Sequence, residues 1–223
     1  MRKICEILKR KDVGEMGIGA MIIFIAMVLV AGIAASVLIQ TSTKLESQAM
    51  RSGSDTIAEV ASGIAIFDIT GKKNTDIQYL AITVRPRAGS PDIDLNHKVI
   101  IMTDGTDKVL LRYDYADAGH FASTVDADGD LFGTDTWNDL TTEEFGIIIL
   151  EDADTSASQY TPVLNKGDKA VLSVQCGAAT GAFAGEIDER TDVYGKIMPE
   201  VGSPGIIAFT TPASYNDIIM DLQ

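Results

Sequence analysis

The sequence predicts an α+β protein, in which a long apolar helix near the amino terminus precedes an antiparallel β-sandwich or barrel. Residues 18–39, 22 in all, contain no charged residue. From residue 66 onward, short segments rich in Val and Ile are closed by Gly, Pro or Asp, as strands are. The 223 residues, 46% of them hydrophobic, are enough for one such helix and one globular domain of ordinary size.

The basic residues are concentrated before the apolar segment. Residues 1–17 hold five Lys and Arg against three Asp and Glu, while the rest of the chain holds 13 against 29, a net charge of −16. A domain this acidic repels nucleic acid and anionic lipid, so we expect no nucleic-acid partner.

Residues 18–39 have the length and composition of a transmembrane helix. At 1.5 Å per residue they span about 33 Å, which is enough to cross a hydrocarbon core. The segment exceeds the apolar core of about 7 to 15 residues that is usual in secretory signal peptides. Since the basic residues precede it, the positive-inside rule keeps the head cytoplasmic and sends the carboxyl-terminal domain out.

Small residues recur four apart in this segment, Ala31 with Ala35 and Gly32 with Ser36. Such pairs let neighbouring helices approach closely. An isolated single-span anchor is the alternative, because the spacing is common by chance in Ala-rich helices. We predict helix packing at these four residues.

Residues 41–65 predict an amphipathic continuation of the helix, with apolar residues at roughly helical spacing among polar ones. The Ser52-Gly53-Ser54 stretch predicts a loosened turn, after which Ser54 or Asp55 caps a restarted helix. A flexible neck between two parts of the chain is the other interpretation of this stretch.

Six segments then predict strands: 76–86, 97–105, 107–115, 145–152, 169–176 and 205–212. In the last but one, alternation places Cys176 on the apolar face, as a small buried hydrophobe. Cys5 lies on the other side of the apolar segment, so we expect no intramolecular disulfide.

We predict no catalytic residue, no enzyme activity and no required cofactor, because no catalytic motif occurs. We predict that both histidines lie at the surface, because His97 is at the start of a strand and His120 is in a Gly-flanked loop. N-glycosylation at the usual sequon is excluded, because none of the five asparagines has Ser or Thr two positions later: Asn74, Asn96, Asn138, Asn165 and Asn216.

The sharpest acidic cluster is "DADGD", which places Asp126, Asp128 and Asp130 at alternate positions. Alternate carboxylates on a curving loop can point at one hard cation, so Ca²⁺ or Mg²⁺ is a hypothesis here. The glycine position and the twelfth residue, Trp137, do not fit an EF-hand. A solvated acidic turn is the alternative.

The segment "KRKDVGEMGIGAMIIFIAMVLVAGIAASVLIQTS" resembles the amino terminus of an archaeal flagellin (archaellin), a relative of the type IV pilins. Three further segments resemble the globular domain of that family: "FGIIILEDAD", "LNKGDKAVLSV" and "RTDVYGKIMPEVGSPGIIAFTTPASY". The resemblance covers nearly the whole chain and is weakest from residue 87 to 139.

The resemblance implies that a prepilin-peptidase-like protease cuts after Gly17 and leaves Ile18 as the new amino terminus. Residues 1–17 are then a leader, residues 18–65 the helix, and residues 66–223 an immunoglobulin-like β-sandwich. The implied function is a structural filament subunit for swimming, with a membrane-inserted precursor and an extracellular product. The implied partners are like subunits, the leader peptidase, the membrane assembly platform and the motor ATPase.

Two alternatives remain open at this point. The first is an adhesive pilin with the same architecture. The second is a single-span surface protein that binds a ligand, or hydrolyses a substrate, as a monomer.

Overall fold

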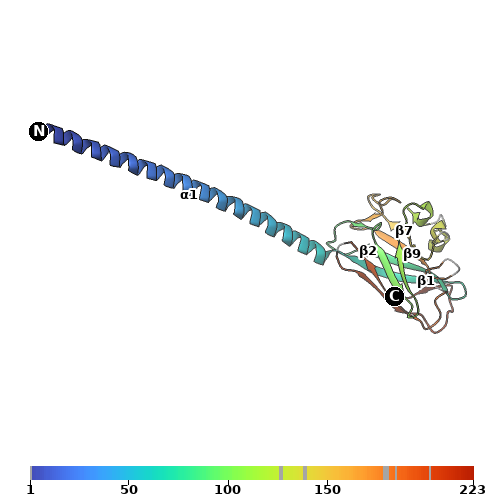
Figure 1. The fold of residues 1–223 in the computed structure, drawn as a ribbon. Coiled ribbons are helices and arrows are strands. Elements are labelled where there is room, and N and C mark those ends of the chain that lie inside the picture. The colour runs from blue at the N-terminus through green and yellow to red at the C-terminus, as the bar shows by residue number, and fades with distance from the viewer. Residues whose placement is uncertain (1, 126–127, 138–139, 178–180, 184, 201) are drawn as a thin grey trace. The chain divides into compact units, whose positions relative to one another are not determined.

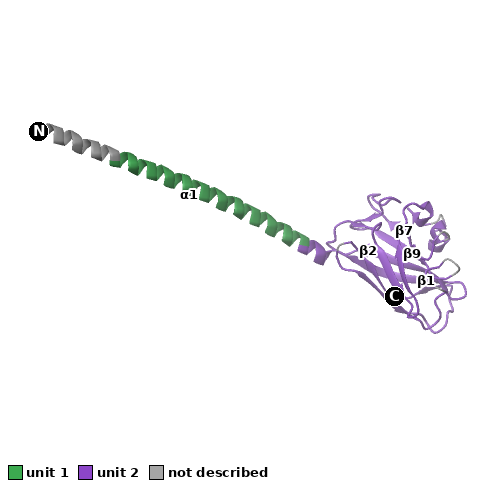
Figure 2. Cartoon of the chain, viewed as in Figure 1, with its two compact units in different colours: residues 1–55 green, residues 56–223 purple. Residues whose placement is uncertain are grey.

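The computed structural model describes residues 2–125, 128–137, 140–177, 181–183, 185–200 and 202–223, and the side chains of its helix from Met16 onward. The chain divides into two compact units, residues 1–55 and residues 56–223 (Figure 2). The first unit is helical. The second contains the end of the helix and all the strands.

One uninterrupted helix, α1, runs from Arg2 to Ala61 (Figure 1). It contains no Pro, and an interior Gly costs a helix only about 1 kcal/mol, which the surrounding helix-forming residues tolerate. Consequently α1 continues through Gly53, and the predicted loosening and restart capped by Ser54 or Asp55 do not occur. The helix ends four residues before the predicted position of 65, and the first strand already begins at Ile64.

The rest of the chain forms strands joined by turns. The strands are β1 (Ile64–Lys73), β2 (Ile77–Pro86), β3 (Ile93–Asp94), β4 (Val99–Thr103), β5 (Lys108–Arg112), β6 (Phe121–Ala122), β7 (Gly146–Glu151), β8 (Val163–Leu164), β9 (Lys169–Gln175), β10 (Asp192–Met198), β11 (Gly205–Thr210) and β12 (Ile219–Asp221). Three short 3-10 helices interrupt them: η1 (Ala118–His120), η2 (Leu131–Gly133) and η3 (Asp135–Trp137).

The strands form two main sheets that enclose one core. The six-stranded sheet has the order β12-β1-β2-β9-β7-β6, and the four-stranded sheet the order β11-β10-β4-β5. All their pairings are antiparallel except the short β6–β7 pair. Buried residues of both sheets share one cluster, for example Ile82 and Leu172 with Ile100 and Ile207. The α+β prediction, with a sandwich after the helix, is confirmed.

The central strands of the six-stranded sheet are buried on both faces. Ala170, Leu172 and Val174 of β9 belong to the main core, and Val171 belongs to a second cluster with Phe132 and Trp137. Burial on both faces explains why β7 and β9 have nearly continuous apolar sequences. Cys176, just after β9, is fully buried in the main core, as predicted.

Six strands were not predicted from the sequence: β1, β3, β6, β8, β10 and β12. In β10 only Val193 and Ile197 are fully inward-facing, with Gly195 between them, so the apolar signal is weak. A Cβ built on Gly195 would lie 2.7 Å from the carbonyl oxygen of Ile101 on β4. The glycine lets β10 and β4 approach closely. Because glycine has a low strand propensity, it also weakens the sequence signal for β10.

Candidate functional site

The most unusual surface of the molecule is the apolar part of α1. Between Met16 and Ile39, fifteen large apolar side chains are between 51% and 72% exposed. By length and composition this is a helix that could cross a membrane, and none of its most apolar window is buried. Covering so many Ile, Val, Leu, Met and Phe side chains is worth on the order of tens of kcal/mol before entropy is counted. This surface therefore requires lipid or other protein around it.

The predicted packing and cleavage residues all lie on this exposed helix. Ala31, Gly32, Ala35 and Ser36 are exposed. A Cβ built on Gly32 would meet no atom within 4 Å, so nothing within the single chain requires a glycine there. The Gly17–Ile18 bond lies inside α1, and the Ile18 side chain is 64% exposed.

The end of α1 is fastened to the sandwich within the second unit. The buried Ser62 hydroxyl donates back to the Ala58 carbonyl, and the Ser62 carbonyl accepts from Ser203 N at 2.9 Å. Gly63 has φ +151°, and a Cβ built there would lie 2.6 Å from the Ser203 carbonyl oxygen. The Gly63 carbonyl accepts from Arg87 N at 2.9 Å. Two segments distant in sequence thus hold the start of β1.

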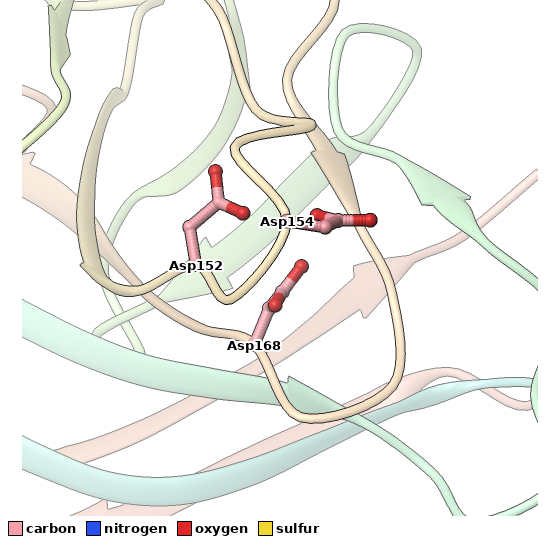
Figure 3. Close-up of side chains that lie close together, drawn as sticks. All are labelled: Asp152, Asp154 and Asp168. Atoms are coloured by element: carbon pink, nitrogen blue, oxygen red, sulfur yellow. The ribbon is translucent and has the colours of Figure 1, made fainter.

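Three carboxylates, Asp152, Asp154 and Asp168, converge where β7 leaves the sheet and β9 enters it (Figure 3). One oxygen from each lies within 4.8 Å of the others. The cluster forms because β7 and β9 pair as far as Glu151 and Lys169, which brings the flanking loops together. Asp152 and Asp154 show the same alternate spacing as "DADGD", but the sequence alone could not supply the third member.

These carboxylates already accept hydrogen bonds from their own loops. Asp168, 1% exposed, accepts from Asn165 N at 2.9 Å, and Asp152 accepts from Ala157 N at 3.1 Å. Asp154 accepts from Asn165 Nδ2 at 2.6 Å. The Ser156 hydroxyl and then its backbone N–H favour the charged form of Asp154 and lower its pKa, whereas desolvation opposes them. These hydrogen bonds stabilise the loops that carry the cluster.

The predicted cation loop lies elsewhere. Asp126 is outside the described residues, while Asp128 and Asp130 are both exposed. The Asp130 carboxylate accepts from Phe132 N at 3.0 Å and caps η2. Part of its hydrogen-bonding capacity is therefore used by the backbone.

The two histidines differ. His97 is exposed, as predicted, and its ring lies 3.2 Å from Asp94. The prediction for His120 was wrong, because its side chain is only 2% exposed. Asp117 caps η1 and turns His120 inward, where Nδ1 lies 3.2 Å from the Asp114 carbonyl oxygen and Nε2 lies 3.8 Å from Glu144. The Gly-flanked loop gave no sign of this local 3-10 turn.

The buried Cys176 has no reactive character. Complete burial raises the pKa of its thiol well above the ordinary value of 9.0, so the thiolate is not populated near neutral pH. The exposed apolar helix is the candidate functional site.

Comparisons with known proteins agree with this conclusion. Residues 14–209 match the model of the family described as archaeal-type flagellin. The chain is 46% identical over 219 residues to Flagellin B2 of Methanocaldococcus jannaschii, covering 96% of this chain and 95% of that protein. The crystal structure of archaeal flagellin FlaB1 from the same organism matches with a TM-score of 0.64 and 33% identity, over 73% of this chain and 98% of that one. The archaeal flagellum of Methanospirillum hungatei matches in fold, with a TM-score of 0.57 and 14% identity, over 92% of this chain and 98% of that one.

Proposed function

This chain belongs to the archaeal-type flagellin family and is a structural subunit of a helical filament for motility, and we propose that residues 18–61 form the core of that filament. The observation that carries the proposal is the exposed apolar surface between Met16 and Ile39. A single copy in water cannot cover that surface. Parallel copies can cover it by packing helix against helix, and a contact of this kind that does not close repeats along an axis.

We propose that the chain is cut between Gly17 and Ile18 by a prepilin-peptidase-like membrane protease. The cut falls between the basic head and the apolar helix. This position supports the proposal that the head is a leader, which sets the membrane topology and is then removed. The helix stays on the exported protein, unlike the apolar core of an ordinary signal peptide. The mature subunit would begin at Ile18 and have 206 of the 223 residues.

The direct test is mass spectrometry of filaments sheared from cells. We expect a mature amino terminus at Ile18. A mature chain that starts at Met1, or one that is cleaved beyond Ser36, would contradict both the leader proposal and assembly through this helix. Replacing Gly17 by a bulky residue should block processing, with the same change at Gly19 as the matched control.

The precursor is proposed to be inserted in the membrane with its basic head in the cytoplasm and residues 56–223 outside. The charge asymmetry supports this orientation: residues 1–17 carry a net charge of +2, and the part after them carries −16. A membrane assembly platform and a motor ATPase would extract and polymerise the subunit. Protease protection of the sandwich in inverted vesicles, with digestion in intact cells, would test the orientation.

We infer that the subunit performs no catalysis and requires no cofactor. Two features support a purely structural role: the absence of a catalytic motif from the sequence, and the family to which the chain belongs. Deletion of the gene for this chain would distinguish a swimming filament from an adhesive fibre. Loss of swimming with intact attachment is expected, and lost attachment with intact swimming would favour an adhesive fibre.

A divalent cation, Ca²⁺ or Mg²⁺, remains a proposal for Asp126, Asp128 and Asp130. The alternate spacing of hard oxygen ligands supports it. Calorimetry on shed subunits should detect heat of binding, which D128N with D130N removes. The double variant D152N with D168N is the matched control, and binding that is lost only in that control would contradict this placement.

A further inference from the structure

The outer face of the four-stranded sheet is apolar and unpartnered within the second unit. Its strands alternate strictly, so that one set of side chains enters the core and the other points away from it. In the outward set, Ile206 is 68% exposed, Tyr194 56%, Leu110 50% and Met198 42%. Single exposed apolar residues need no explanation, but a group on one face marks an interaction surface.

Strand register makes these residues a continuous patch. Ile206 of β11 is paired with Lys196 of β10, which is paired with Ile101 of β4, which is paired with Leu110 of β5. This row crosses all four strands, because directly opposed residues of antiparallel strands share a face. Tyr194 and Met198 flank Lys196 on β10 at the same two-residue spacing.

The charge of this face is opposite to that of its domain. Residues 56–223 hold 11 Lys and Arg against 27 Asp and Glu, a net charge of −16. The outer face carries Lys108, Arg112 and Lys196 against one carboxylate, Asp192. Lys108 and Lys196 form no ion pair with any residue of the part of the chain that the structure describes, and both are exposed.

We propose that this face, centred on Lys196 and Ile206, docks against an acidic surface of the neighbouring copy of the chain in the filament. The inference rests on the proposed filament function, which places sandwiches beside one another at high effective concentration. Sandwiches of net charge −16 repel each other wherever carboxylate surfaces meet. The outer face offers apolar area and positive charge, the combination that makes a contact with such a neighbour favourable.

The contact is heterologous, so that the outer face of one copy meets a different surface of the next. Two outer faces related by a two-fold axis would oppose Lys196 to Lys196 and would also close into a dimer. A contact between unlike surfaces avoids this repulsion and repeats without closing, as a filament requires. Electrostatic complementarity would fix the register, and the apolar side chains would supply most of the affinity.

Hydroxyl-radical footprinting of native shed filaments tests the proposal directly. Tyr194 and Met198 are both readily oxidised, and Tyr160, 67% exposed in the loop between β7 and β8, is the internal control. Oxidation of Tyr194 and Met198 should fall several-fold in filaments relative to dissociated subunits, while that of Tyr160 should not fall in parallel. Equal oxidation of Tyr194 in filaments and in subunits overturns the interface and leaves the filament function intact.

Variants provide an independent test. Ile206→Thr and Lys196→Glu should each speed the loss of subunits from sheared filaments about tenfold, as truncating a central contact residue does. Ile218→Thr and Lys166→Glu are matched changes at exposed positions off this face. Dissociated subunits of all four variants should melt like the wild type. Equal dissociation of test and control variants overturns the proposal, whereas failure of the wild type to form filaments at all overturns the filament function together with it.

Discussion

The same kinds of apolar side chain are exposed on α1 and buried in the sandwich. Ile22, Ile25 and Ile33 on the helix are more than half exposed, whereas Ile82, Ile100 and Ile207 in the sandwich are completely buried. The sandwich covers its apolar surface within one chain, so its stability belongs to the monomer. The helix covers nothing alone, so its structure in water depends on neighbours. One chain therefore combines a domain that is stable alone with a helix that is stable only when it packs against other molecules.

The largest effect should come from a charge in the helix. Leu29→Asp should abolish filaments, because a buried carboxylate in the helical core costs about 3 kcal/mol or more in each copy. Electron microscopy and pelleting of shed material measure this. Ser47→Asp, beyond the uncharged segment, is the control and should retain more filament. The melting temperature of the sandwich should not change, and filaments at wild-type yield from Leu29→Asp would break the comparison.

A cavity in the sandwich should have the converse effect. Ile82→Ala should lower the free energy of unfolding of the sandwich by about 2 to 5 kcal/mol, through lost burial and the cavity left behind. Ile218→Ala, at a 66% exposed position, should change it by less than about 0.5 kcal/mol. Chemical denaturation of dissociated subunits distinguishes the two. Similar losses from both variants would show that burial in the sandwich does not set its stability.

Two Gly→Ala substitutions should have opposite effects on the stability of the helix and of the sandwich. Gly63→Ala should destabilise the sandwich by about 1 to 3 kcal/mol, because its φ of +151° and the 2.6 Å approach to Ser203 exclude a side chain. Gly53→Ala in α1 meets no atom within 4 Å and should stabilise the helix by up to about 1 kcal/mol. Thermal melts followed separately by helical and sheet signals would show opposite signs. A stabilising Gly63→Ala would contradict the fastening described above.

The smallest effect concerns an acidic corner of the sandwich. Desolvation, with the charges of Asp188, Glu186 and Glu189, raises the pKa of Asp76 above its usual 3.8, although Lys73 partly offsets this. Ionisation of Asp76 therefore opposes folding above the raised pKa, and this opposition disappears as the pH falls below 3.8. Asp76→Asn should raise the melting temperature slightly at pH 7, with the gain vanishing near pH 3. Asp92→Asn, at an exposed loop position, is the control, and a gain that grows on acidification would contradict the assignment.

The sequence was informative where periodicity and composition act over many residues. The uncharged stretch to Ile39 and the Val- and Ile-rich segments of β2, β4, β7 and β9 were recognisable because each is dictated by local pattern. The strand β10 was missed because Gly195 serves an approach between strands, a tertiary requirement. The inward turn of His120 depends on a cap and on packing that no periodicity encodes.

The candidate site divides in the same way. The exposed helix and its small residues could be found from the sequence, because apolarity without charge over 22 residues has few explanations. The grouping of Asp152 and Asp154 with Asp168 could not, because it depends on the β7–β9 register. The patch around Lys196 likewise arises only when four strands that are separate in sequence are placed side by side.

The way β1 follows α1 has a mechanical consequence. The strand leaves the helix after Ser62 and Gly63, and pairs with β2 in antiparallel register from Ile64 opposite Pro86 to Lys73 opposite Ile77. Any load that reaches the sandwich through α1 enters at Ile64, where the pairing of β1 with β2 begins. Viscous drag on a turning filament would therefore load the hydrogen bonds between β1 and β2 first.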